Sequence, residues 1–359
     1  MNQQLFLEMI DAAINGKTID LSEVNEEFIR VAKEQTFLPF LYVASKDKKY
    51  KKYYIQSVLI HEKINEVGKL IDDILNEAKI PHIFLKGYEL QNLYPDPNLR
   101  MMGDIDLIVK PEDFDNAKIV LINKGFIQGK DDEHHLQLIK NEIEIELHHN
   151  LFERNEEWML YFNKPFDNTY QINDYNLSFK LNYYYMYILA HYAKHIQNCG
   201  EGIRPIIDLY LLYKISLKKN ISIKIENNLI NFDKMIKSAF FSIFKEKTCE
   251  ITNKYYNLFI NSLFERGVHG LNVDSTLVVY QNNNNIGLVK KLFNNKRFKL
   301  NYIKTKYKSS KLIITIPFIY ILEFFKLLLI YFNNLKKSKV NKKEYRKMYK
   351  SLGIKDNYF

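Results

Sequence analysis

Two aspartates stand two positions apart in a segment that is otherwise apolar, "DIDLIV" at residues 104–109. Side chains alternate between the two faces of a β-strand, so Asp104 and Asp106 share one face, while Ile105, Leu107 and Val109 share the other. Two carboxylates held so close repel one another, and each loses hydration if it is buried. A divalent cation between them resolves the conflict, and so does solvent at the end of the strand. The segment therefore predicts either a metal site or a solvated strand end.

The sequence around this segment alternates between helical and strand periods. Apolar residues recur every three or four positions between Tyr54 and Ala78, which is typical of one buried helix face. Later patterns predict a strand over 82–87, a short helix over 88–94, a strand over 104–109, a helix from Pro111 to Gly125, and two strands, 134–140 and 143–149, joined as a hairpin at Asn141-Glu142. This order predicts an α+β fold with a small mixed sheet of about five strands, flanked by N-terminal and C-terminal helical segments.

The same patterns divide the chain into four segments. We expect an N-terminal helical segment over 1–80, an α/β domain that carries the chemistry over 81–178, a helical domain over 179–280, and a basic C-terminal segment over 281–359 with an apolar helix over 312–332. The polar stretch "QNNNNIG" is the expected linker before the last segment.

The net charge of +10 is concentrated near the C-terminus. Residues 286–359 contain 19 Lys and Arg against three acidic residues, a charge of +16, which leaves −6 on the other 285 residues. This asymmetry argues against nucleic acid as a partner and for a basic segment with a role of its own.

Composition also indicates the class of protein and its cellular compartment. Hydrophobic residues make up 47% of the chain, which excludes a disordered protein. Two cysteines, Cys199 and Cys249, are too few for a disulfide scaffold or a Cys-rich zinc site and fit a reducing compartment. The N-terminal residues lack the basic region of a signal peptide. We expect a cytoplasmic protein.

The apolar segment 312–332 is long enough to span a bilayer, but Glu323 and Lys326 lie near its centre. Three interpretations are open: a helix packed on the protein, an interfacial helix whose basic tail binds anionic lipid, and a transmembrane span. The first is favoured. The second would place the protein at the inner face of the membrane.

A third acidic group is expected beside the two aspartates. In "IEIELHHN", Glu144, Glu146 and His148 share one face of the predicted strand. If this strand lies next to the aspartate strand, three carboxylates meet, and oxygen ligands of this kind suit Mg²⁺ with open positions for substrate phosphates. A solvated polar face is the plainer alternative.

Four elements in order give the chain a family resemblance. "FLKGYEL", "YPDPNLRMMGDIDLIV", "AKIVLINKGF" and "IEIELHHNL" resemble the uncharacterised bacterial nucleotidyltransferase family within the DNA polymerase β-like superfamily. A later stretch, "LAHYAKHIQNCGEGIRPIIDLYLLY", resembles the helical part of that family. The resemblance implies that Asp104 and Asp106 are paired metal ligands. It also implies that Glu146 is the third carboxylate, which binds metal or acts as general base.

The phosphate-binding segment departs from the wider superfamily. Lys86 and Gly87 stand where the superfamily has a Gly-Ser pair at a helix start that holds the triphosphate, and Tyr88 replaces the serine. Gly87 still allows close approach of the backbone to an anion. Lys86 can add a charge-assisted contact to the β- or γ-phosphate.

The remaining candidates each have a structural alternative. Arg100 could clamp phosphate or pair with Asp96 or Asp104, and His148 could bind phosphate or orient Glu146. His191 and His195 share a helix face, and we expect them to be structural or to face the nucleotide. For Arg204 and Asp208, four residues apart, we expect an ion pair within one helix. Glu144 is expected at the rim of the site.

These residues together predict the reaction. A metal-dependent enzyme would transfer a nucleoside monophosphate from an NTP such as ATP to a hydroxyl-type acceptor and release pyrophosphate, with Mg²⁺, or Mn²⁺ in its place, as cofactor. The acceptor could be a small molecule, a sugar or a protein. Two other functions stay open: an Asp-x-Asp glycosyltransferase that uses a nucleotide-sugar, and a non-catalytic nucleotide-binding adaptor.

Overall fold

The computed structural model describes residues 1–131, 135–152, 158–198, 201–266 and 342–354. The chain forms two compact units. The first comprises residues 1–192 and 203–256, and the second comprises residues 193–202 and 257–359. Every candidate residue around the two aspartates belongs to the first unit. The predicted division into four segments stays a prediction.

Helices begin and end the described part of the chain. The α-helices of the described residues are α1 Gln3–Asn15, α2 Glu26–Glu34, α3 Leu38–Ser45, α4 Lys51–Glu77, α5 Lys86–Leu90, α6 Phe114–Asn123, α7 Leu181–Asn198, α8 Arg204–Lys218, α9 Ile230–Phe244, α10 Tyr256–Arg266 and α15 Lys342–Leu352. The strands are β1 His82–Phe84, β2 Asp104–Val109, β3 Ile127–Asp131, β4 His135–Lys140, β5 Ile143–His148, β6 Thr169–Gln171 and β7 Asn176–Phe179.

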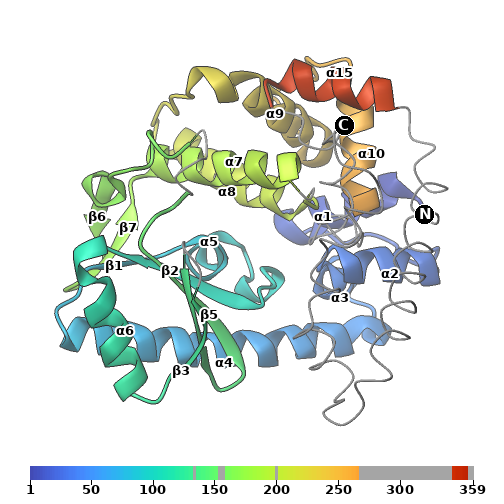
Figure 1. The fold of residues 1–359 in the computed structure, drawn as a ribbon. Coiled ribbons are helices and arrows are strands. Elements are labelled where there is room, and N and C mark those ends of the chain that lie inside the picture. The colour runs from blue at the N-terminus through green and yellow to red at the C-terminus, as the bar shows by residue number, and fades with distance from the viewer. Residues whose placement is uncertain (132–134, 153–157, 199–200, 267–341, 355–359) are drawn as a thin grey trace, which may run out of the picture. The chain divides into compact units, whose positions relative to one another are not determined.

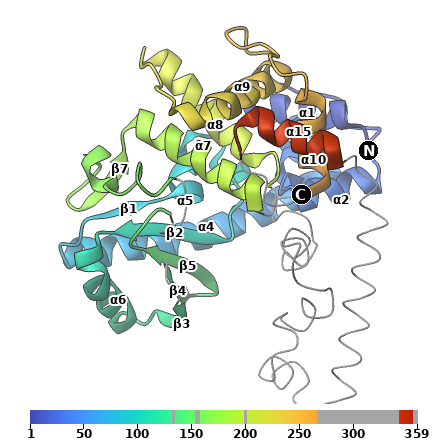
Figure 2. The same ribbon diagram turned by 45° about the horizontal axis from the view of Figure 1, so that its top comes forward.

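The seven strands form one mixed sheet in the order β3-β4-β5-β2-β1-β7-β6. β2 is central and runs parallel to β5 and antiparallel to β1. Helices α4 and α6 cover one face of the sheet, and α7 and α8 lie over the other (Figures 1 and 2). The predicted α+β fold with a mixed sheet and helices at both ends is confirmed.

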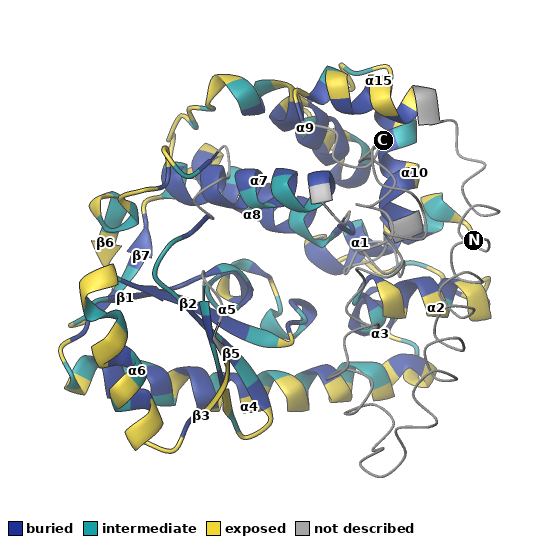
Figure 3. Ribbon diagram, viewed as in Figure 1, coloured by how far each residue is buried: buried dark blue, intermediate teal, exposed yellow. Residues whose placement is uncertain are grey.

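The core explains why the aspartate strand folds as it does. Ile105, Leu107 and Val109 of β2 are fully buried against Ile71 of α4 and Leu121 of α6. Figure 3 shows β2 mostly buried, while α4 and α6 carry exposed residues along their outer sides. Because Ile105, Leu107 and Val109 take the core face, Asp104 and Asp106 are left on the opposite face.

The hairpin between β4 and β5 forms as predicted. Its two turn residues, Asn141 and Glu142, have φ angles of 50° and 67°, which is the left-handed backbone that a tight hairpin turn requires. Gly125 (φ 85°) ends the α6 segment, as expected. The sequence patterns missed β3, β6 and β7.

The segment expected to be a strand over 82–87 has a different structure. β1 ends at Phe84, and Lys86 already belongs to helix α5. The chain must leave the sheet here, since Lys86 has a left-handed backbone (φ 47°) that no strand contains. Lys86 and Gly87 therefore start a helix instead of ending a strand.

In the second unit, α15 buries Tyr345, Met348, Tyr349 and Leu352. The Tyr349 hydroxyl lies 3.5 Å from the carbonyl oxygen of Ile196 in the same unit. Among the described residues, no helix is both long and apolar enough to cross a membrane. The apolar segment 312–332 lies outside the described residues.

Candidate active site

The register of two parallel strands builds the acidic part of the site. β2 and β5 pair so that Asp104 is opposite Glu144 and Asp106 is opposite Glu146. All four carboxylates project from the face of the sheet that does not contact α4. The strand that carries Glu146 therefore lies beside the aspartate strand, as the sequence predicted.

Three side chains from these strands come close enough to share a cation. The potential ligand atoms of Asp106, Glu146 and His148 all lie within 4.8 Å of one another. His148 Nε2 is 3.2 Å from Asp106 Oδ1 and 3.3 Å from Glu146 Oε2. The group differs from the predicted metal set, since it contains His148 and does not contain Asp104. Asp104 lies one pleat earlier on the same face of β2.

Lys86, at the start of α5 just after β1, contacts the same carboxylate from the other side of β2. The backbone N–H of Leu85 donates to the Asp106 carbonyl (2.8 Å), which places the next residue beside that side chain. Lys86 Nζ then donates to Asp106 Oδ1 at 2.8 Å. The left-handed backbone of Lys86 costs about 1 kcal/mol or more, and strain of this kind persists where surrounding contacts hold it.

The two aspartates differ in their electrostatic surroundings. Burial, and then the charge of Asp106, raises the pKa of Asp104 to about 6. Burial acts on Asp106 in the same direction, but Lys86 and the hydrogen bond to His148 outweigh it and hold the pKa of Asp106 well below its usual value. Asp106 is therefore the stabilised anion of the pair, and Asp104 is the one that bears the repulsion.

Gly87 and Tyr88 have separate structural roles. A side chain at Gly87 would meet Met102 Cβ at 3.2 Å, so the glycine lets α5 lie close to the segment before β2. The Tyr88 ring packs on Phe84, with ring centroids 4.5 Å apart, and on Gly68 of α4. Tyr88 thus faces the core, and its hydroxyl does not take the place of the serine found in the wider superfamily.

Arg100 pairs with a residue that sequence reasoning did not connect to it. Its Nε and Nη2 each donate to Asp208 of α8 at 2.9 Å, and the Tyr94 hydroxyl donates to the same carboxylate at 2.8 Å. Arg100 and Asp208 are 6% and 3% exposed. Of the two roles considered for Arg100, the local pairing with Asp96 or Asp104 is wrong, because both oxygens of Asp208 match the guanidinium fork.

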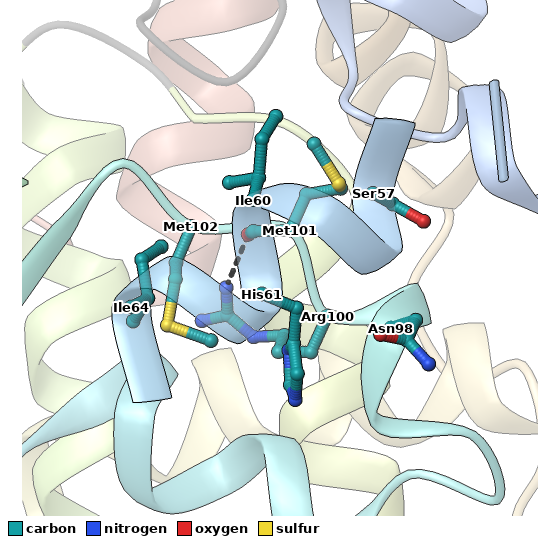
Figure 4. Close-up of a pocket in the computed structure, with 8 residues that line it drawn as sticks. All are labelled: Ser57, Ile60, His61, Ile64, Asn98, Arg100, Met101 and Met102. Carbon is teal, nitrogen blue, oxygen red and sulfur yellow. Dashed lines mark hydrogen bonds between the residues drawn. The ribbon is translucent and has the colours of Figure 1, made fainter. Parts of the chain in front are cut away.

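The backbone before the aspartate strand is held from two sides. Arg100 Nη1 and Arg204 Nη1 both donate to the Met101 carbonyl, at 3.0 and 2.9 Å. Figure 4 shows the Arg100 guanidinium directed at this oxygen. Arg204 therefore holds the segment that precedes Asp104.

A small cavity lies next to Arg100 and Met101. It is lined by Ser57, Ile60, His61, Ile64, Asn98, Arg100, Met101 and Met102 (Figure 4). Its volume of about 10 Å³ corresponds to a single water molecule, and its lining contains no acidic side chain. A nucleotide does not fit this cavity.

The other candidates lie apart from this group or at its edge. Glu144 accepts a hydrogen bond from Gln137 Nε2 of β4, as a residue at the rim would. The His191 ring packs on Tyr187, with centroids 5.9 Å apart. His195 Nδ1 lies 3.6 Å from Glu201 Oε2 within the second unit. The two histidines therefore have structural contacts.

Comparison with known proteins supplies the family. The family described as uncharacterised nucleotidyltransferase matches residues 25–221, more than half of the chain. No curated protein and no solved structure matches the chain. The matched residues contain every member of the acidic group together with Lys86, Arg100 and Asp208. The chain belongs to the family of uncharacterised nucleotidyltransferases and is a transferase enzyme.

Proposed function

We propose that this protein transfers a nucleoside monophosphate from an NTP to a hydroxyl group of an acceptor and releases pyrophosphate, with Mg²⁺ as cofactor. One observation carries the proposal. The pairing of β2 with β5 sets Asp106 beside Glu146, and Lys86 contacts the same aspartate from the end of β1. Carboxylates for a cation and an ammonium for phosphate therefore converge on one point.

The donor set fits a divalent cation. Asp106, Glu146 and His148 have ligand atoms within 4.8 Å, and Asp104 precedes them on the same face. Mg²⁺ and Mn²⁺ prefer carboxylate oxygens, whereas imidazole suits other transition metals better. We therefore assign Asp104, Asp106 and Glu146 as ligands, and His148 as the donor that orients Asp106. A bound cation would neutralise phosphate charge and lower the pKa of the attacking hydroxyl.

The other residues bind and position the substrate. Lys86 can reach from Asp106 to a β- or γ-phosphate oxygen, and Gly87 lets the backbone come close to the phosphates. Glu146 can also accept the proton of the acceptor hydroxyl. Because Arg100 is already engaged with Asp208 and Met101, we assign it the positioning of the segment before Asp104 and no phosphate contact.

The test compares four forms of the protein. Each is incubated with every NTP, Mg²⁺ and cell extract as acceptor source, and pyrophosphate release is measured. We expect release from wild type, a loss of at least a hundredfold in Asp106→Asn and Glu146→Gln, and near-normal release from the rim variant Glu144→Gln. Hydrolysis of a UDP- or GDP-sugar alone would support a glycosyltransferase, and binding without turnover would support an adaptor.

The location and the membrane contact rest on the sequence. We propose a cytoplasmic enzyme whose basic segment, 286–359, contacts anionic lipid at the inner face of the membrane. Sedimentation with anionic vesicles at low salt tests this contact. If the wild-type protein does not sediment, the lipid proposal is wrong and the assignment of the site is unaffected.

A further inference from the structure

Tyr187 of α7 packs on His191 through its ring, and no contact described so far uses its hydroxyl. The Tyr187 ring packs among aromatic side chains, with centroids 5.8 Å from Phe179 and 6.1 Å from both Phe152 and Phe162. Only 1% of the residue is exposed. The ring is therefore fixed in one place, and the position of its hydroxyl is fixed with it.

The neighbouring turn of α7 shows which way this helix face points. Tyr184 precedes Tyr187 by three residues, which places both on one side of the helix. The Tyr184 hydroxyl lies 3.5 Å from the carbonyl oxygen of Lys86. Burial raises the pKa of Tyr187, the charge of Lys86 lowers it, and the charges of Asp106 and Glu146 raise it. The side of α7 that carries Tyr187 therefore meets the start of α5, where Lys86 lies.

The hydroxyl of Tyr187 makes no hydrogen bond to any residue that the structure describes. Two other buried tyrosines of the same unit are paired, since Tyr185 donates to Asp233 at 2.7 Å and Tyr94 donates to Asp208 at 2.8 Å. The Tyr183 and Tyr256 hydroxyls have no hydrogen-bond partner among the described residues. A buried phenol usually finds a partner, because an unpaired polar group loses hydration without compensation. A free hydroxyl that faces an active site is therefore available to a substrate.

We propose that the Tyr187 hydroxyl donates a hydrogen bond to a β- or γ-phosphate oxygen of the NTP, next to Lys86. This inference rests on the proposed function and adds a specificity residue for the triphosphate. Burial raises the pKa of Tyr187, so the phenol keeps its proton over the whole neutral range. A neutral donor suits an anionic oxygen better than it suits a metal ion, and bonds to charged acceptors are the strong ones.

The test variant is Tyr187→Phe, which keeps the ring packing and removes only the hydroxyl. Inorganic triphosphate with Mg²⁺ is the probe, and its affinity is measured by calorimetry. We expect binding about tenfold weaker or worse, as for loss of a bond to a charged group, and an unchanged melting temperature. Binding of a nucleoside monophosphate should not change.

Tyr183→Phe is the matched control. The Tyr183 hydroxyl is buried and has no hydrogen-bond partner within the described residues, and its ring belongs to the same aromatic cluster. Burial, and then the neighbouring Tyr161, Tyr187 and Asp167, raises its pKa, and of these residues only Tyr187 is assigned to the site. We expect this variant to bind inorganic triphosphate like the wild type.

The outcomes separate this inference from the proposed function. If wild type binds Mg²⁺-triphosphate, Asp106→Asn abolishes binding and Tyr187→Phe binds normally, the role of Tyr187 is wrong and the proposed function stands. Equal weakening by Tyr187→Phe and Tyr183→Phe also overturns it, because the effect would then come from packing. If the wild-type protein binds no NTP in the presence of Mg²⁺, the proposed function is wrong, and the role of Tyr187 is wrong with it.

Discussion

Asp104 and Asp106 have the same chemistry and opposite energetic roles. From the sequence, mutual repulsion is expected to burden both. In the structure Lys86 and His148 neutralise Asp106, whereas the pKa of Asp104 is raised to about 6 by burial and by its neighbour. The two residues should therefore respond differently to the same substitution.

We predict that Asp104→Asn leaves the metal-free protein as stable as the wild type or stabilises it by up to about 1 kcal/mol, since a raised pKa marks an unfavourable charge. Asp106→Asn should lower the free energy of unfolding by about 1–3 kcal/mol, because it leaves Lys86 without its partner. Urea denaturation in EDTA measures both. A larger loss in Asp104→Asn than in Asp106→Asn would contradict the assignment of charges.

Glu89 of α5 gives a prediction about pH. Burial raises its pKa, although the Ser178 hydroxyl donates to Glu89 Oε1 at 2.7 Å. The folded state therefore holds the proton at a pH where the unfolded state has released it. Stability contributed by this group is present below the unfolded pKa and is lost as the pH rises through the folded pKa.

Glu89→Gln removes this titration, and its amide oxygen can still accept from Ser178. We predict that the variant gains stability relative to the wild type as the pH is raised from 4 to 8. Thermal melts of both proteins at several pH values measure this difference. A constant difference between the two proteins across that range would show that Glu89 is not the titrating group.

At the scale of elements, α4 and α5 meet at a glycine. A methyl group at Gly68 would overlap the Tyr88 ring, which itself packs on Phe84. Gly68→Ala should cost about 1–3 kcal/mol of stability, although alanine is the better helix former. Gly103→Ala is the control, since a side chain there has no neighbour within 4 Å among the described residues. Equal stability of both variants would mean that Tyr88 can move aside.

The Arg100–Asp208 pair joins the segment before β2 to α8. Arg100→Met leaves Asp208 buried with only the Tyr94 hydroxyl, and should lower the free energy of unfolding by about 3–5 kcal/mol. The control is Glu34→Gln in the Arg30–Glu34 pair, whose side chains are 58% and 42% exposed, and it should cost less than about 0.5 kcal/mol. If Arg100→Met plus Asp208→Leu is no more stable than Arg100→Met alone, the loss does not come from the unpaired charge.

Sequence patterns could predict the elements whose partners are close in the chain. The alternation in β5, the 3–4 period of α4 and the turn at Asn141-Glu142 are local signals, and each formed as predicted. The acidic face followed from alternation alone, because Asp106 and Glu146 could take no other side once the apolar residues were buried.

The rest depended on distant pairing. β6 has three residues and β7 has four, too few for a period to be seen, and β7 pairs with β1 some ninety positions earlier in the chain. Asp208 accepts from Arg100, 108 positions earlier, whereas the sequence offered only Arg204 of its own helix as a partner. Tyr187 lies in a helix whose sequence reads as ordinary apolar helix. The helix at Lys86 requires a left-handed backbone that its residue type does not indicate.

At the scale of the whole molecule, charge and chemistry occupy different parts of the chain. Residues 286–359 carry +16, while the acidic group, Lys86 and Tyr187 all belong to the first compact unit. This separation fits an enzyme in which a bound cation offsets the repulsion between the acidic site and the nucleotide. The basic segment would then make a contact elsewhere.

The central claim is that the α-phosphate is transferred and pyrophosphate leaves. It is tested most directly by incubating the wild-type protein with Mg²⁺, cell extract and an NTP labelled at either the α- or the γ-phosphate. The account predicts that label from the α-position appears on an acceptor, that γ-label appears only in pyrophosphate, and that Asp106→Asn gives neither. Transfer of γ-label to the acceptor, or α-label transfer by Asp106→Asn at the wild-type rate, would contradict it.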